Sequence, residues 1–296
     1  GMGPDMDQLG ENSAAAVIAS GKGNMTAAPV IVNLTPDGSF HRYFLHAEKD
    51  STLRVAFLSN SEKEETRPFA LQVKIYAEEG SHVELTMPQM LGTEVLDLTD
   101  IGGLLEKGAS VELVKMELGA EKVYTGALMT LKGDGSSFTA HIGYQGFTGQ
   151  HLDMNYVARH LGRKTESLME SNGVLNGNAF KLFRGSIDFV KGCAGSVGNE
   201  KEDVLLLGDD VVNQTIPLIL CAEEDVEGNH GASIGELDEK TLFYLMSRGF
   251  TKEAAEAMIA GARLEAIAAE IPVPEVREQV EKYLEEIGRA SCRERV

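Results

Sequence analysis

The chain has 296 residues, of which 43% are hydrophobic and 25% charged, a composition typical of a globular protein that can bury a full core. The formal net charge of −19 argues against nucleic-acid binding, which needs clustered Lys and Arg, and it suits a basic partner. No run of about 18 apolar residues is present to span a membrane, and the N-terminus lacks the basic start of a signal peptide.

The cysteines are few, and none forms a CxxC pair: Cys193, Cys221 and Cys292. An odd, sparse set is typical of a reducing compartment, so a cytoplasmic protein is expected. The last ten residues, IGRASCRERV (287–296), resemble a translated sequencing-adapter fragment. We interpret residues 287–296 as a non-native tail and leave Cys292 out of the functional reasoning.

Residues 1–28 are rich in Gly, Ala and polar side chains and predict an N-terminal extension with at most one short helix, at residues 13–20. From residue 29 to 235 the pattern changes to short runs that alternate apolar and polar side chains between Gly, Asp and Asn turns. Such period-two alternation predicts β-strands with one buried face. The clearest runs are LRVAFL (53–58), ALQVKIY (70–76), VELTM (83–87), SVELVKMEL (110–118) and SFTAHIGY (137–144).

A weak repeat runs through these strands. Gly80, Gly108 and Gly135 each end a polar turn, and their separations are 28 and 27 residues. Apolar residues stand three and five positions after each glycine, and a looser fourth copy begins at Gly177 with Phe180 and Leu182. The first three copies carry Val83, Val111 and Phe138, then Leu85, Leu113 and Ala140. A β-sandwich would also give many short strands, but near-constant spacing favours a β-helix in which each coil buries its face against the next.

After Gly235 the apolar period becomes helical, which predicts a small helical domain over residues 236–286. Asp238 and Thr251 are the expected N-caps, Gly249 an expected C-terminal cap, and Pro274 the expected start of a third helix. The expected apolar stripes are Leu242, Phe243, Leu245 and Met246 on the first helix, Ala255, Met258, Ile259, Ala262 and Ile267 on the second, and Val276, Val280, Tyr283 and Leu284 on the third. These stripes fit a partner interface and a fold-back onto the last coils equally well.

The common catalytic motifs GxxxxGK[ST], GxSxG and HExxH are absent from the sequence. A carbohydrate-active β-helix enzyme would need paired carboxylates on one coil face, and no coil repeats such a pair. His160 lies in a polar stretch between Arg159 and Arg163, so a surface or turn position is expected.

The junction between strands and helices holds the best candidate ligands. Cys221 ends a strand, His230 follows in a glycine-rich stretch, and Asp225 and Glu227 lie between them. Thiolate, imidazole and carboxylate are groups that bind iron. Two native cysteines cannot supply four thiolates, so other ligands would be needed. A buried, purely structural role remains an alternative for Cys221, for His230 and above all for Cys193.

The stretch HGASIGELDEKTLFYLMSRG (230–249) resembles the C-terminal signature of the SufB/SufD family of iron–sulfur cluster assembly proteins. SNGVLNGNAFKLFRGSIDFVKGCAGS (171–196) and VLLLGDDVVNQTIPLIL (204–220) resemble the family more loosely, and the resemblance covers roughly residues 40–286. It implies a mainly β protein, a right-handed parallel β-helix followed by a small C-terminal helical domain, and it resembles the compact single-gene members.

The resemblance also implies partners. The helical domain would dock a SufC-like ABC-type ATPase through Leu242, Phe243, Leu245, Met246 and Arg248. The last β-helix strands would pair with a second copy or a paralogue, and ATP hydrolysis by the partner would expose a site for a transient iron–sulfur cluster.

The sequence departs from both branches of the family at the ligand positions. Val211 stands where SufB-like members carry Cys, Gly231 where they often carry Glu, and Gly228 where SufD-like members carry Cys. Of the matched ligand positions His230 remains, with Cys221, Asp225 and Glu227 as possible helpers. The expected function is a non-catalytic scaffold subunit; the alternative is an architectural or regulatory ATPase-binding subunit that holds no cluster.

Overall fold

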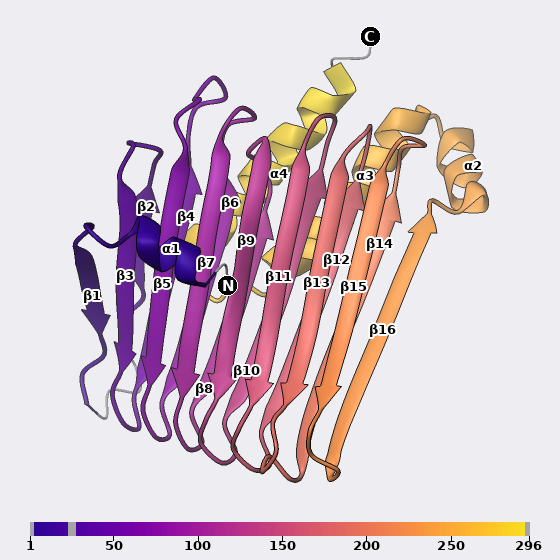
Figure 1. Cartoon of the computed structure of the whole chain (residues 1–296). Helices are drawn as coiled ribbons and strands as arrows, with labels where there is room; N and C mark the ends of the chain where they lie inside the picture. The colour runs from indigo at the N-terminus through magenta and orange to yellow at the C-terminus, as the bar shows by residue number, and fades with distance from the viewer. Residues whose placement is uncertain (1–2, 23–27, 294–296) are drawn as a thin grey trace.

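Strands alternate between two parallel sheets throughout this computed structural model, which describes residues 3–22 and 28–293. We call the sheets odd and even after their strand numbers (Figure 1). The odd sheet contains β1 (Ala15–Ala19), β3 (Phe40–Ala47), β5 (Phe69–Ala77), β7 (Leu96–Leu105), β9 (Lys122–Leu131), β11 (His151–His160), β13 (Phe180–Phe189) and β15 (Val212–Cys221). The even sheet contains β2 (Val30–Leu34), β4 (Thr52–Asn60), β6 (His82–Met90), β8 (Ser110–Glu117), β10 (Ser137–Gly146), β12 (Glu166–Leu175), β14 (Ser196–Leu206) and β16 (Val226–Glu236).

Every strand pairing in the described chain is parallel and joins strands two apart in sequence. A β-sandwich of Greek-key strands would instead pair strands antiparallel. The predicted mainly β fold with a parallel β-helix core is therefore confirmed, and the sandwich alternative is wrong.

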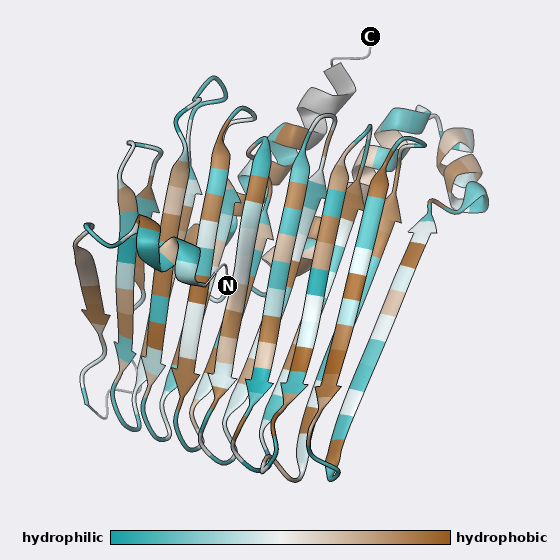
Figure 2. Cartoon of the chain, in the orientation of Figure 1, coloured by the Kyte–Doolittle hydropathy of each residue, from teal (hydrophilic) through white to brown (hydrophobic). Residues whose placement is uncertain are grey.

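The space between the two sheets, which we call the lumen, holds the main apolar core. Hydrophobic and hydrophilic residues alternate along the strands (Figure 2), so alternate side chains enter the lumen. The repeated positions lie in register: Val83 pairs with Val111, which pairs with Phe138, and all three side chains are buried. The repeat thus records one coil of the solenoid.

The turn before each repeated strand needs a left-handed backbone. Gly80, Gly108 and Gly135 have φ values of 69°, 64° and 67°, where glycine is unstrained. The next turn of this series uses Lys164, with φ of 52°, which interrupts the glycine spacing before it resumes at Gly195, with φ of 76°. The predicted fourth copy at Gly177 is wrong, because it does not belong to this series. Gly177 precedes β13, which lies in the odd sheet, and Phe180 of that strand is only half-buried.

The N-terminal segment also differs from its prediction. Helix α1 (Pro4–Leu9) comes earlier than the helix expected at residues 13–20, and Ala15–Ala19 is instead strand β1, paired with β3. Helix α1 lies against the outer face of the odd sheet (Figure 1) and buries Met6 there. The alanine-rich sequence favours helix locally, but the edge of β3 offers a ladder of backbone hydrogen bonds that overrides this preference.

Three helices follow β16: α2 (Glu239–Ser247), α3 (Lys252–Ala268) and α4 (Pro274–Arg293). The expected caps are confirmed, because the Asp238 and Thr251 side chains accept hydrogen bonds from Thr241 N–H and Ala254 N–H. Gly249 has φ of 98°, as a C-terminal cap requires. Helix α4 begins at Pro274 and continues into the tail, of which residues 294–296 lie outside the described residues.

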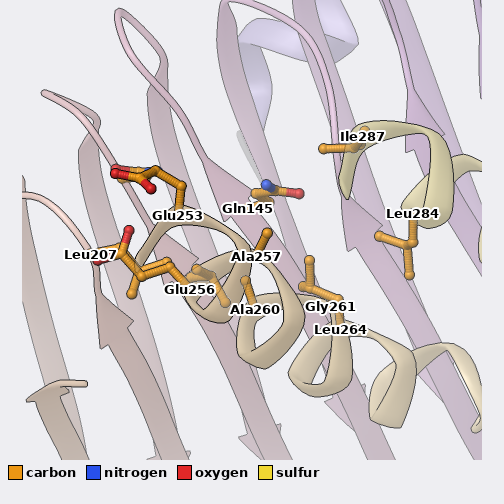
Figure 3. Close-up of a pocket in the computed structure, with 12 residues that line it drawn as sticks. Gln145, Leu207, Glu253, Glu256, Ala257, Ala260, Gly261, Leu264, Leu284 and Ile287 are labelled. Atoms are coloured by element: carbon orange, nitrogen blue, oxygen red, sulfur yellow. The ribbon is translucent and has the colours of Figure 1, made fainter. Parts of the chain in front are cut away.

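Helices α3 and α4 cover the outer face of the even sheet (Figure 1), where they form a second apolar core with residues of β4, β6 and β8. The predicted stripe on α4 is confirmed, since Val276, Val280 and Leu284 are buried. The stripe predicted on α3 is wrong in part: Ala255 and Ile267 are buried, but Met258 is 45% exposed. A hollow of about 80 Å³ remains between α3, α4 and the sheet, lined by Gln145, Ala257 and Gly261 among others (Figure 3).

Within the described residues, no helix is both long enough and apolar enough to cross a membrane.

Candidate functional site

The last coil leaves one end of the solenoid open. Strand β15 has β13 as its one neighbour and β16 has β14, so each presents a free backbone edge. Their side chains are largely exposed, and the apolar ones include Ile216, Leu218 and Ile234 at 51%, 46% and 48%. Unpaired edges beside exposed apolar side chains are features of an interface.

His230 lies at this open end, on the lumen side of β16. Its in-register partner on β14 is Glu200, and Nδ1 of His230 is 3.1 Å from Oε2 of Glu200. The histidine side chain is 27% exposed, whereas that of Glu200 is 1% exposed. Glu200 fits because the opposite position on β13 is Gly185, where a Cβ would overlap the carboxylate. The buried acid Glu200 therefore contacts the imidazole from inside the fold, and the imidazole itself reaches the solvent.

A second buried acid lies two residues further along β14. Glu202 Oε1 accepts hydrogen bonds from Lys181 Nζ at 2.6 Å and from the Tyr144 hydroxyl at 2.9 Å. The Thr215 hydroxyl donates to Oε2 of Glu202 at 2.5 Å. Both Glu202 and Lys181 are fully buried, and such a pair is tolerated in the lumen because hydrogen bonds satisfy its charges. The lumen near the open end thus contains a polar network, to which Tyr144 of β10 and Lys181 of β13 contribute.

Burial dominates the electrostatics of this network. It raises the pKa of Glu200, although His230 opposes that shift by its charge and hydrogen bond. It also lowers the pKa of Lys181, against the attraction of Glu202. Desolvation followed by repulsion from Glu202 raises the pKa of the Tyr144 hydroxyl well above its usual value. Shifted groups that converge at an open end are a common feature of functional sites.

The other predicted ligands lie apart from His230. Cys221 is the last residue of β15, exposed, at the end of the strand next to the turn. His230 is the fifth residue of β16, so the two are offset by about 13 Å along the strands. Asp225 lies in the turn, and Glu227 faces away from the lumen, where it accepts a hydrogen bond from the Asn229 side chain at 3.1 Å.

No three His, Cys, Asp or Glu side chains in residues 3–22 and 28–287 are grouped to hold a metal ion. His230 and Cys221 are the exposed nitrogen and sulfur donors at the open end of the solenoid. Within one chain the offset along the strands keeps His230 and Cys221 apart, so a site that uses both residue types would need donors from more than one chain.

Two further side-chain predictions have clear outcomes. Cys193 is fully buried, as predicted, and burial raises the pKa of its thiol. The surface or turn position predicted for His160 is wrong: its ring is fully buried in the lumen and hydrogen-bonds to Thr165 and Ser167. Burial lowers the pKa of His160 to about 4. Arg159 faces outward because successive strand residues point to opposite faces, and Arg163 is exposed in the turn that follows the strand.

Helix α2 projects beyond the end of the even sheet, directly after β16 (Figure 1), and buries none of its residues. Phe243 and Met246 of the predicted partner-binding set are 74% and 47% exposed, while Leu242 and Leu245 are half-buried. Arg248 lies over the Tyr244 ring, with its guanidinium carbon 5.2 Å from the ring centroid. The sequence left open whether the helices fold back onto the coils or stay free for a partner. Helices α3 and α4 fold back onto the sheet, and α2 stays uncovered.

Sequence reasoning missed Glu200, Glu202 and Lys181. The segment SVGNEKEDVLL carries charges on both faces of the strand, so its alternation hides which side is buried. The usable signal was Gly185, which removes a side chain opposite one of the acids.

Comparison with known proteins agrees with this architecture. Residues 30–263 match the family model described as "SUF system FeS cluster assembly, SufBD core domain". An iron–sulfur cluster assembly SufBD family protein of Mycobacterium tuberculosis is 31% identical over 205 residues, covering 68% of this chain and 24% of that protein. SufB of Bacillus subtilis is 27% identical over 202 residues, covering 68% of this chain and 43% of SufB.

SufD of Bacillus subtilis is 31% identical over 126 residues, covering 43% of this chain and 29% of SufD. The chain therefore spans less than half the length of these relatives. The family match covers most of the solenoid and part of α3, and it confirms the resemblance found at residues 230–249. The chain belongs to the SufBD core family of the SUF system for iron–sulfur cluster assembly.

Proposed function

We propose that this chain is a non-catalytic scaffold subunit of a SUF-type complex and that His230 donates a ligand to the nascent iron–sulfur cluster. The observation that carries this proposal is the position of His230 at the open end of the lumen, on a strand with a free edge and beside a buried carboxylate. The cluster is cargo that forms there and is passed on. Imidazole is one of the protein ligands known for iron–sulfur clusters.

The open end supports the proposed dimer. Pairing β15 and β16 with the same strands of a second copy or a paralogue would satisfy their backbone groups and cover Ile216 and Ile234. It would also bring two His230 side chains and two Cys221 thiols to one interface, which supplies donors that one chain keeps apart. Asp225 and Glu227 are the carboxylates that we propose as further ligands.

Helix α2 is the proposed docking site of a SufC-like ABC-type ATPase, which would carry out ATP hydrolysis. Its exposed side chains Phe243 and Met246, with Arg248 at the end of the helix, form the anchor, and Leu242 and Leu245 support them from below. Aromatic residues, Met and Arg are enriched in the centres of protein interfaces. We place the complex in the cytoplasm, because Cys193 and Cys221 are unpaired thiols, as a reducing compartment maintains them.

A second candidate is an architectural subunit that binds the ATPase and holds no cluster. The absence of a preformed group of three ligands within the described chain favours it. The two candidates predict different spectra from the same preparation.

The deciding experiment is anaerobic co-expression with the ATPase, reconstitution with iron and sulfide, and absorption spectroscopy of wild type, His230→Ala and the control His41→Ala. Charge-transfer bands that weaken with His230→Ala but not with His41→Ala would support the scaffold. A stable complex without bands in any of the proteins would leave the architectural subunit, and failure to copurify with the ATPase would contradict both candidates.

A further inference from the structure

Glu200 is an acid whose two oxygens have different surroundings. Oε2 lies 3.1 Å from Nδ1 of His230, and Oε1 is buried without a hydrogen-bond partner among the described residues. A carboxylate in this state is costly, because a buried polar atom without a partner loses its hydration. A lumen position that only had to be filled would more readily hold an apolar residue.

The surrounding strands make room for this one acid. A Cβ at Gly185 would overlap both the carboxylate carbon and Oε1 of Glu200, so glycine leaves room for the acid in its present position. The neighbouring acid Glu202 already has three donors of its own, from Lys181, Tyr144 and Thr215. Glu200 is therefore the acid of this network that faces His230.

Other His–Glu pairs in the protein differ in burial. His46 Nε2 lies 2.8 Å from Glu78 Oε1, but Glu78 is 34% exposed, so water can replace either partner. Beside His230, the carboxylate is 1% exposed and the imidazole is the group open to solvent. One partner is fixed inside the fold, and the other is presented outside it.

A neutral imidazole carries one proton on either Nδ1 or Nε2, and the nitrogen without the proton is the one that can bind a metal. A carboxylate that accepts Nδ1–H fixes the tautomer and the ring orientation and makes the other nitrogen a better donor. We propose that Glu200 is a positioning residue for His230: its carboxylate accepts Nδ1–H and leaves Nε2 as the metal-binding atom at the open end. This inference rests on the proposed role of His230 as a ligand.

The test reads the tautomer directly. Full-length protein labelled with 15N-histidine is examined by long-range 15N–1H correlation spectroscopy at pH 8, and His230→Ala identifies the His230 signal. Wild type is expected to show protonated Nδ1 and unprotonated Nε2. Glu200→Ala should give a mixture of tautomers, while Glu78→Gln, at the exposed pair, should leave His230 unchanged.

Two results would overturn the inference. One is a wild-type His230 protonated on Nε2, which would mean that Glu200 donates its own proton to Nδ1. The other is a tautomer that does not change in Glu200→Ala. If Glu200→Ala does not fold, Glu200→Gln serves instead, because it keeps the size of the side chain and one acceptor oxygen. It should shift the tautomer population of His230 only in part.

A cobalt(II) titration separates this inference from the proposed function. Wild type should bind the ion more tightly than Glu200→Ala by about 10- to 100-fold, and His230→Ala should lose that binding. Equal binding by wild type and His230→Ala would contradict the ligand role of His230. Binding that depends on His230 but is unchanged in Glu200→Ala would contradict the positioning role alone.

Discussion

The ring of Tyr144 lies against the α-carbon of Gly173, its partner in register on the next even strand. A Cβ at Gly173 would overlap the ring carbons, so the absence of a side chain lets Tyr144 reach Glu202, two strands away, with a hydrogen bond of 2.9 Å. Glycine here is a packing requirement, because the tyrosine side chain extends along the solenoid axis.

Gly173→Ala should therefore destabilise the protein by about 1–3 kcal/mol, the usual cost of overpacking a closed core. Denaturant unfolding measures the effect. Gly102→Ala is the matched control, because a Cβ there meets no atom within 4 Å. Equal stability of the two variants would show that the lumen adapts to the extra methyl group.

Glu117 should make the protein less stable as the pH rises. Burial raises its pKa to about 7, and although Lys115 Nζ lies 2.7 Å away, the nearby Asp97 adds to the shift. The folded state then holds a proton that the unfolded chain releases above about pH 4.5. Between pH 4.5 and 7 this group should lower the free energy of unfolding by up to about 1.4 kcal/mol per pH unit. Glu117→Gln should remove that slope in denaturant unfolding at several pH values, and an unchanged slope would contradict the assignment.

His160 should act in the opposite direction. Burial lowers its pKa to about 4, so between pH 6.5 and 4 the unfolded chain binds a proton that the folded state excludes. The stability from this group is complete above pH 6.5 and is lost as the pH falls, again by up to about 1.4 kcal/mol per pH unit. His160→Gln should flatten this acid limb, whereas His151→Gln, on the outer face, should not. A titration of His160 near pH 6.5 by NMR would refute the prediction.

Exposed Phe243 provides a test of the docking helix. Phe243→Ser should leave the unfolding free energy within about 0.5 kcal/mol of wild type, because the side chain is 74% exposed. It should reduce copurification of the ATPase at least tenfold, as loss of an aromatic anchor usually does. Met258→Ser, at an exposed position of α3, is the control that should retain the partner. Normal copurification with Phe243→Ser would place the docking site elsewhere.

Ile234 tests the proposed pairing of the open ends. It is 48% exposed on the last strand, on the same face as His230, and an inward-pointing charge at an edge opposes pairing. Ile234→Lys should shift the protein from dimer toward monomer in analytical ultracentrifugation, with at least tenfold weaker association. The control Val17→Lys places the same charge on β1 at the other end of the solenoid, where the residue is 66% exposed. A wild-type monomer, or a dimer unaffected by Ile234→Lys, would exclude this interface.

Features that depend on neighbours along the chain could be predicted from the sequence. Alternation over about ten residues predicts strands, the Gly80, Gly108 and Gly135 spacing predicts the coil, and Asp238 and Thr251 mark the helix starts, because sterics and capping act locally. The signature at residues 230–249 also identified the family. Two local predictions failed. Residues 15–19 form strand β1 instead of the expected helix, because they pair with β3, and Lys164 adopts a left-handed backbone where the repeat predicts glycine.

The sequence does not specify which polar residues meet in the lumen. Glu200 and His230 are 30 residues apart and meet because parallel register stacks β16 on β14. Lys181 and Glu202 are 21 residues apart and meet across the lumen, because β13 and β14 belong to opposite sheets. A register change of one residue would turn these side chains to the outer face. The same alternation buries His160 and turns Arg159 outward. Strand pairing, which the alternation of one strand does not specify, therefore set the environment of the candidate site.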